Sequence, residues 1–401
     1  MQAKRQRNRT GNMSMRWIRL CALCLMLTAG CCLAAGCGLS ALGDASAGDG
    51  AGLSTPAPVL PAGWRVYLPD REFSSITVAK AHVLAGGMEG IVRYDPERDD
   101  WQPVQPQEGS FRLVKAMHAD DRGNLWIGCQ TGLACLPDFV GTSAGGLPES
   151  DTLAPVACVR VETLAGRKIE AVSCLLEARD GTLYVGSQAG ALALPEEGAM
   201  QLAGGVLPQT GRWLAREDGM PLPMVNAMLQ DRRGTLWFGS YIARNGGVAC
   251  VGEGFTQFFD HDSGLADDYV TTIAEDADGS VWVGTGVYTS GGAARFVWRE
   301  NAYFPDALLG TSDGLAGAKV RFIHVDAGGV RWICSEYDGI AVLSPDGRRL
   351  RLLTTADGMP DNEAKQIAAD AEGGLWIACR RGVLHLDAAA VKRITDGAAD
   401  E

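Results

Sequence analysis

A unit that recurs six times along the chain constrains its fold more than any other feature. Each copy has a Gly three residues before an aromatic residue, as in DDRGNLWIGC at 120–129, and five of the six have an Asp six residues before it, Ala178 being the exception. Glycine supplies the positive φ of a tight hairpin turn, and the Asp side chain can close an Asx-type turn. The aromatic positions are Trp126, Tyr184, Trp237, Trp282, Trp332 and Trp376.

A weaker seventh copy lies upstream, around Leu84. Gly86 and Gly90 follow Leu84 at the same offsets at which Gly128 and Gly132 follow Trp126. Each unit divides into four short alternating segments, and such a unit cannot bury both of its faces alone, so it must stack on its neighbours. The sequence therefore predicts an all-β fold, a seven-bladed β-propeller of four-stranded antiparallel blades.

The ring also needs a closing strand. Residues Trp64–Leu68 precede the first unit and resemble the outer strand of the others. We predict that they pair with the last blade around Gly382–Leu386, with Val391–Ile394 as the alternative source of that strand.

The N-terminus differs from the rest of the chain. Six basic residues accompany an apolar run from about Leu20 to Ala35, which is typical of an export signal. Two segments resemble a bacterial lipobox, one ending at Cys31 and one at Cys37; Cys37 is favoured for lipidation because it ends the apolar run, and a plain secretory signal is the alternative. The predicted organisation is an export signal at 1–36, a flexible Gly/Ala/Ser/Pro tether at 37–62, the propeller at 63–396 and a disordered tail at 397–401.

Charge and hydropathy exclude some classes of protein. A mean hydropathy of zero excludes a polytopic membrane protein. The net charge of −12 falls to about −18 when the six basic residues of the signal are removed, which disfavours a nucleic-acid partner because phosphate binding needs a basic surface. The chain is expected outside the cytoplasm of a bacterium, attached to a membrane through a lipid anchor.

The repeat resembles the two-component regulator propeller repeat, in which an Asp-Gly-Leu linker leads into an alternating strand, Asp-x-x-Gly, Leu-Trp-Ile-Gly-Thr and Gly-Leu. Linkers of this kind stand at 218–221, 262–265, 313–315 and 357–362. The resemblance implies a propeller that senses or binds a ligand. Such sensors also have kinase segments and a second ring of repeats, which are not found in this sequence. The resemblance therefore implies ligand binding but does not extend to direct signal transduction.

Two sets of residues are candidates for ligand binding on the face that carries the linkers. The first set lies in the loops that follow the aromatic strands and comprises Tyr241, Arg244, Asn245, Tyr288, Tyr337 and Arg380. Its side chains could stack on a sugar or a peptide, and ordinary loop variation is the alternative interpretation. The second set consists of the polar residues eleven positions before each aromatic, namely Lys115, Ser173, Asn226, Thr271, Arg321 and Lys365. They could surround the central channel and attract an anion, and the alternative is that they are solvated residues at the starts of strands.

No cofactor or metal is expected. His118 and His324 share one repeat position in blades that are not neighbours, which favours packed histidines over metal ligands. Seven cysteines follow Cys37; Cys129 and Cys135 could pair, but small core residues are the favoured interpretation.

The sequence thus predicts a non-enzymatic binding propeller whose partner is an envelope protein or a carbohydrate. A second hypothesis is an enzyme similar to streptogramin lyase, which would need a His and a carboxylate together on the loop face, and His261 is the one His in a linker. A third is a structural component of an envelope assembly.

Overall fold

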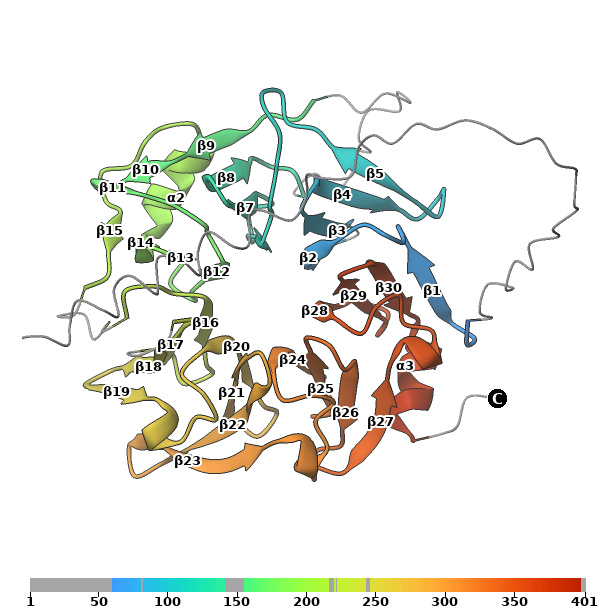
Figure 1. Cartoon of the computed structure of the whole chain (residues 1–401). Helices are drawn as coiled ribbons and strands as arrows, with labels where there is room; N and C mark the ends of the chain where they lie inside the picture. Colours follow the sequence, from blue (N-terminus) through green and yellow to red (C-terminus); the bar gives the residue numbers. More distant parts are fainter. Residues whose placement is uncertain are drawn as a thin grey trace, which may run out of the picture. The chain divides into compact units, whose positions relative to one another are not determined.

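The computed structural model describes residues 60–80, 82–140, 155–215, 220, 222–242 and 246–397. All of them belong to one compact unit, Pro58–Glu401. Within these residues the strands form seven four-stranded antiparallel sheets and one short hairpin, and the sheets stand as blades around a central axis (Figure 1). The predicted seven-bladed propeller is confirmed.

Each blade runs from its inner strand at the axis to its outer strand at the rim. Blade 1 comprises β2 (Phe73–Ala79), β3 (His82–Gly87), β4 (Gly90–Asp95) and β5 (Asp100–Val104). Blade 2 comprises β6 (Ala116–Ala119), β7 (Leu125–Cys129), β8 (Gly132–Leu136) and β9 (Val159–Val161). Blade 3 comprises β12 (Cys174–Glu177), β13 (Leu183–Ser187), β14 (Gly190–Leu194) and β15 (Arg212–Trp213). Blade 4 comprises β16 (Ala227–Gln230), β17 (Leu236–Ser240), β18 (Gly247–Gly252) and β19 (Phe255–Phe259).

The remaining blades follow the same order. Blade 5 comprises β20 (Val270–Glu275), β21 (Val281–Val287), β22 (Ser290–Arg299) and β23 (Ala302–Leu309). Blade 6 comprises β24 (Val320–Val325), β25 (Arg331–Ser335), β26 (Ile340–Leu343) and β27 (Arg349–Leu353). Blade 7 comprises β28 (Ala364–Ala369), β29 (Leu375–Cys379), β30 (Gly382–Leu386) and, from the other end of the chain, β1 (Trp64–Tyr67).

The ring closes through β1, which pairs antiparallel with β30 from Trp64↔Leu386 to Tyr67↔Val383, as predicted. Figure 1 shows the blue β1 beside the red β30. The alternative outer strand was wrong, because Val391–Ile394 lies in helix α3 (Ala388–Thr395). The Asp387 side chain caps this helix by accepting a hydrogen bond from the Ala390 amide at 2.8 Å, and the buried Ala390 and Ile394, four residues apart, give it an apolar face.

The repeated Asp has two functions, of which the sequence predicted one. In blade 2, Asp120 Oδ1 accepts hydrogen bonds from the Arg122 and Asn124 amides, which closes the turn, while Oδ2 accepts one from Trp126 Nε1 at 2.9 Å. The same bond to the indole recurs in blades 4, 5 and 7. The turn glycine has positive φ in all six stronger copies, as predicted.

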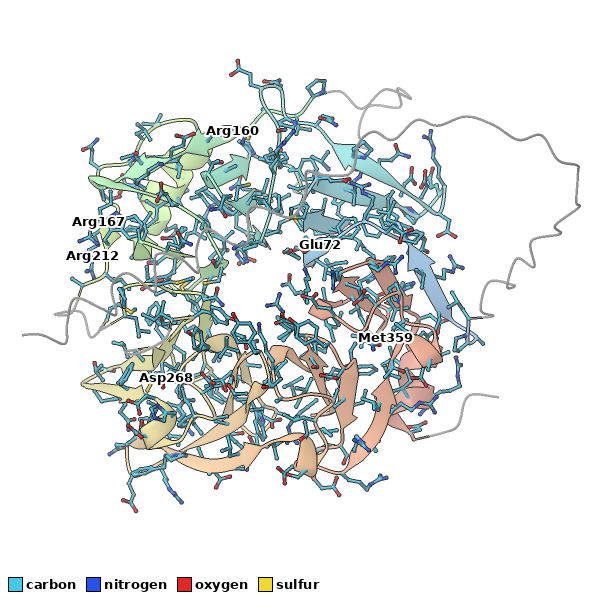
Figure 2. The ribbon with its side chains drawn as sticks, in the orientation of Figure 1. Glu72, Arg160, Arg167, Arg212, Asp268 and Met359 are labelled. Carbon is cyan, nitrogen blue, oxygen red and sulfur yellow. The ribbon has the colours of Figure 1, made fainter. Side chains whose placement is uncertain are left out.

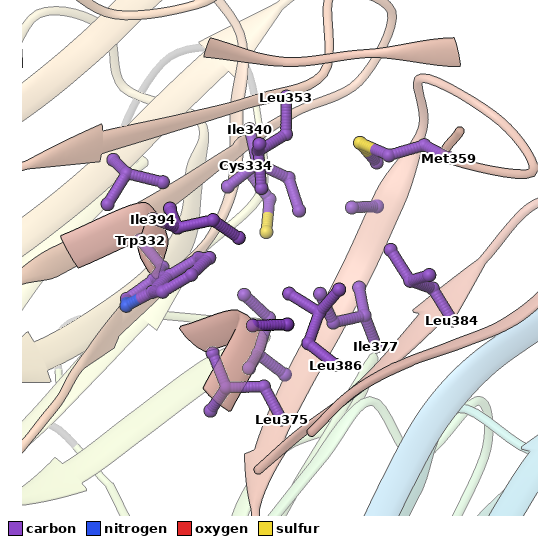
Figure 3. Close-up of a cluster of buried hydrophobic side chains, with 14 of the residues drawn as sticks. Trp332, Cys334, Ile340, Leu353, Met359, Leu375, Ile377, Leu384, Leu386 and Ile394 are labelled. Atoms are coloured by element: carbon purple, nitrogen blue, oxygen red, sulfur yellow. The ribbon is translucent and has the colours of Figure 1, made fainter. Parts of the chain in front are cut away.

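Adjacent blades approach each other at the small residue two positions after each aromatic. A Cβ built on Gly128 would lie 2.6 Å from Val172 Cγ1, and one built on Gly239 would lie 2.4 Å from Val270 Cγ1. Both valines belong to the next blade or its linker, so only a minimal side chain fits there. Apolar clusters fill the space between blades, and Figure 3 shows the one between blades 6 and 7 around Trp332 and Ile377.

Some elements have no counterpart in the repeat. A hairpin of β10 (Thr163–Leu164) and β11 (Arg167–Lys168) precedes blade 3, and helix α2 (Glu196–Ala203) joins β14 to β15. Three linkers begin with a 3-10 turn, namely η2 (His261–Ser263), η3 (Thr311–Asp313) and η4 (Thr355–Asp357). No helix in the described ranges is long and apolar enough to cross a membrane.

Candidate functional site

One face of the propeller gathers the segments that the sequence singled out. In each antiparallel blade the inner strand starts opposite the end of the second strand; for example, Ala364 pairs with Cys379 and Val320 with Ser335. The linkers between blades and the loops between second and third strands therefore share this end of the ring. We call it the linker face.

Linker conformation follows from the Asp-Gly-Leu pattern. The glycines Gly264, Gly314 and Gly358 have φ of +128°, +109° and +109°, which L side chains rarely adopt. The next residue turns inward, so Leu265 and Leu315 are buried between blades. Each linker is thus anchored before it delivers the inner strand to the axis.

A chain of ion pairs crosses the linker face from blade 1 through blade 7 to blade 6. Glu72, directly before β2, contacts Lys365 at 2.5 Å, and Lys365 contacts Glu363 at 3.6 Å. Figure 2 places Glu72 beside the centre of the ring.

The chain continues on blade 6. Arg321 lies between two carboxylates, with Glu363 at 3.5 Å and Glu336 at 3.6 Å. Glu336 also pairs with Lys319. We call these six residues the ion-pair chain: Glu72, Lys365, Glu363, Arg321, Glu336 and Lys319.

Two groups of the ion-pair chain, Glu336 and Lys319, are held in their charged forms. Burial alone would raise the pKa of Glu336, but the hydrogen bonds from Lys319 and Tyr337 and the charge of Arg321 hold it below its ordinary value. Burial would lower the pKa of Lys319, yet its contacts with Glu336 and Tyr241 raise it. Neither group is therefore poised to exchange a proton near neutral pH. The arrangement suits recognition of a charged or polar group.

Two of the predicted tyrosines meet this chain. The Tyr337 hydroxyl donates a 2.6 Å hydrogen bond to Glu336, and the ring remains 55% exposed. Lys319 Nζ lies 5.6 Å from the centre of the Tyr241 ring, which packs edge-on against Tyr269 with 5.0 Å between centroids. The hydrogen bond to Glu336 raises the pKa of Tyr337, so its phenol stays protonated.

The third predicted tyrosine stands apart. Tyr288, in the turn between β21 and β22, is 79% exposed with a φ of +52°, and no ring contact is found for it among the described residues. Arg380 is exposed, and its backbone amide donates to the Glu363 carbonyl at 3.0 Å. Arg244, Asn245 and Cys37 lie outside the described residues.

The polar positions at the starts of the inner strands divide the ring in two. On blades 3 to 5 they are neutral and bonded to the backbone: Ser173 donates to the Ala171 carbonyl, Asn226 to the Val270 carbonyl, and Thr271 to the Gly284 and Val320 carbonyls. On blades 2, 7 and 6 they are the cations Lys115, Lys365 and Arg321.

Sequence reasoning missed four members of the site, namely Glu72, Lys319, Glu363 and Tyr269. A positional signal existed for three of them, because Lys319, Glu363 and Tyr269 each stand two residues before one of the predicted polar positions, Arg321, Lys365 and Thr271. Glu72 precedes blade 1, where the repeat has no polar residue at that position, so comparing the repeats gave no reason to select it.

The remaining candidates behave as structural residues. His118 Nε2 lies 3.2 Å from Glu177, whereas His324 Nε2 is buried with no partner in the described part of the chain. The cysteines after Cys37 are free thiols, and burial raises the pKa of Cys129 to about 11. No group of three or more His, Cys, Asp or Glu residues that could hold a metal occurs within the described ranges.

The fold and the repeats define the class of protein, a seven-bladed β-propeller. Residues 219–241 and 264–286 match the family model for the two component regulator propeller, so the chain carries repeats of this family. No curated protein matches the sequence.

Solved structures share the fold at low sequence identity. The extracellular domain assigned to the hybrid two component system BT3049 of B. thetaiotaomicron is 16% identical, with a TM-score of 0.62 over 82% of this chain and 41% of that one. PorZ, a surface component of the type-IX secretion system of Porphyromonas gingivalis, is 14% identical, with a TM-score of 0.56 over 79% of this chain and 46% of its own. This chain therefore spans less than half the length of either.

A third structure is of similar size to this chain. A catalytically inactive virginiamycin B lyase from Staphylococcus aureus, solved with quinupristin, is 13% identical, with a TM-score of 0.55 over 81% of this chain and 99% of that one. At these identities the similarity shows the fold and no more.

Proposed function

We propose that this chain is a non-enzymatic, sensor-like propeller that binds a ligand or a protein through its linker face. One observation carries the proposal: the ion-pair chain spans three adjacent blades and ends at Tyr337, an aromatic ring that is largely exposed. A tyrosine ring is large, rigid and amphipathic, so an exposed one is suited to pack against a sugar or a peptide side chain.

Tyr337 is organised for such contact before any ligand arrives. Its hydroxyl is held by Glu336, which is itself held by Lys319. The ring therefore loses little conformational freedom on binding, and the ordering cost that weakens most interfaces is reduced.

The proposed location is outside the cytoplasm, with Cys37 as the site of lipid attachment. The export signal and lipobox-like segment support it, as does the extracellular position of the BT3049 domain and of PorZ, which share the fold. Expression of Cys37→Ser and Cys31→Ser in a bacterial host tests it. We expect Cys37→Ser to move the protein from the membrane to the soluble fraction and Cys31→Ser to leave it at the membrane; the reverse result would assign Cys31.

Binding is tested by capture from envelope extract, with proteins and glycans identified by mass spectrometry. Tyr337→Ala removes the exposed ring of the site, and Tyr288→Ala is the matched control because Tyr288 is more exposed and stands apart. A partner lost only in Tyr337→Ala supports the proposal. A partner retained by both variants would place binding elsewhere and favour a structural role in an envelope assembly.

A lyase is the second candidate, because the structure brings His261 to a carboxylate. His261 Nδ1 lies 3.0 Å from Asp268, and that contact raises the pKa of the imidazole. The pair lies in the linker between blades 4 and 5, and neither residue contacts the ion-pair chain. Turnover of quinupristin that disappears in His261→Ala would show that the chain is an enzyme and would overturn the non-enzymatic proposal.

A further inference from the structure

The Arg321 guanidinium is fixed in place but its hydrogen-bonding capacity is unused. It has five N–H donors, and its contacts are the two carboxylates at 3.5 and 3.6 Å. Charge-assisted hydrogen bonds are shorter, about 2.7–2.9 Å. Within the described part of the chain, no acceptor makes a hydrogen bond with Arg321, although its side chain is only 30% exposed.

Lys115 provides a second cation without a counter-charge. It precedes β6 on blade 2, retains contact with solvent, and pairs with no carboxylate among the residues that the structure describes. Surrounding protein lowers the pKa of Lys115, and the positive charge of Arg321 lowers it further. The inner strands β6, β2, β28 and β24 follow one another around the axis, so Lys115 and Arg321 lie on blades separated by two others, and their side chains interact through their charges.

The local charges do not balance. Together with Lys115, the ion-pair chain holds four cations against three carboxylates, so these seven residues carry one excess positive charge within an otherwise acidic protein. That excess matches a singly charged anion. On the other half of the ring, Ser173, Asn226 and Thr271 already bond to the backbone and offer no competing charge.

We propose that the linker face binds a small ligand through a carboxylate group held between Arg321 and Lys115. This inference rests on the proposed binding function and names the chemistry that the site recognises. The planar fork of Arg321 fits the two oxygens of a carboxylate, Lys115 supplies a point charge from the opposite side, and Tyr337 lies beside the site to contact the body of the ligand.

The test is titration calorimetry on the purified chain with two matched pairs of probes. Glucuronate against glucose represents a sugar acid, and N-acetylalanine against its amide represents a peptide carboxylate. Inorganic phosphate tests whether the site prefers an oxyanion of higher charge. In low salt, we expect one of the two acids to bind at least about tenfold more tightly than its neutral partner, and the pair that responds identifies the source of the carboxylate.

Variants assign the effect to the site. Arg321→Gln should weaken binding of the acid about tenfold or more, and Lys115→Gln should weaken it by a smaller factor, while neutral ligands are unaffected. Arg321→Gln leaves Glu336 paired with Lys319 and Glu363 paired with Lys365, so the fold is retained. Arg348→Gln is the control, because it removes the same charge from an exposed turn between β26 and β27.

The outcomes separate the two proposals. If neutral and acidic partners bind equally, or if the acid binds equally to Arg321→Gln and Arg348→Gln, the carboxylate proposal is wrong while ligand binding at the linker face stands. Tighter binding of phosphate than of either acid would overturn the single-charge argument. Absence of binding by both acids at tens of millimolar would also overturn it, and the Tyr337 capture experiment would then decide the binding function independently.

Discussion

Replacing Asp231 with Ala tests whether the repeated Asp, where it is buried, stabilises its blade mainly by accepting hydrogen bonds from buried side chains. Asp231 is fully buried, and its Oδ2 accepts hydrogen bonds from Trp237 Nε1 at 2.9 Å and from the Tyr303 hydroxyl. Its Oδ1 accepts from the Arg233 and Thr235 amides in the turn. Asp231→Ala leaves two buried side-chain donors unpaired at roughly 1–3 kcal/mol each, a loss of about 2–6 kcal/mol.

Asp326 in blade 6 is the matched control within the same molecule. It closes its turn through the Gly328 and Val330 amides at 2.9 Å, but Trp332 Nε1 is buried with no partner among the described residues. Asp326→Ala should therefore cost only about 1 kcal/mol, the value of the turn bonds. Guanidinium unfolding followed by tryptophan fluorescence measures both. A loss in Asp231→Ala no larger than that in Asp326→Ala would refute the reasoning.

Three further predictions follow from packing and titration. Gly239→Ala should cost about 1–3 kcal/mol, because its Cβ would lie 2.4 Å from Val270 Cγ1; unchanged unfolding midpoints would contradict the close packing of blades 4 and 5. Burial lowers the pKa of His324, so below about pH 6.5 the unfolded chain binds more protons than the folded one and the folded state loses stability. His324→Gln should reduce this loss, which is measured as the change in unfolding midpoint between about pH 5 and pH 8. His261→Gln should lower the unfolding midpoint at low pH more than at high pH. The hydrogen bond to Asp268 raises the pKa of His261, so the stabilisation that His261 contributes is present at low pH and is lost as the pH rises through its folded pKa.

The fold was predictable because the repeat fixes local geometry at positions that can be compared. Gly123 and its five counterparts all have positive φ, and Trp64 begins the strand that closes the ring. The helix at 388–395 was not predicted, because the short apolar segment at 391–394 was interpreted as a possible strand, although Asp387 is a favourable N-cap and three helix-forming alanines follow it. The bond from Trp126 to Asp120 was also not predicted, since a side chain that closes a turn gives no sign in the sequence that its second oxygen reaches a buried indole.

The candidate site was predictable only in part. The shared position within the repeat predicted that Lys115, Arg321 and Lys365 lie near the axis, and the position of its loop predicted that Tyr337 lies on the same face. Which charges pair with which depends on contacts between blades, such as Lys365 with Glu72, nearly 300 residues apart in the chain. A periodic pattern specifies where a side chain starts and not which neighbour it meets.

Hydrogen–deuterium exchange with and without the ligand recovered by capture tests the central claim most directly. We expect slower exchange in the linkers at 310–319 and 354–363, which lead to Arg321 and Lys365 at the axis, and unchanged exchange in the turns at 120–124 and 231–235 at the opposite ends of the strands. Protection confined to those opposite turns, with the linkers unaffected, would contradict the assignment of the linker face as the binding surface.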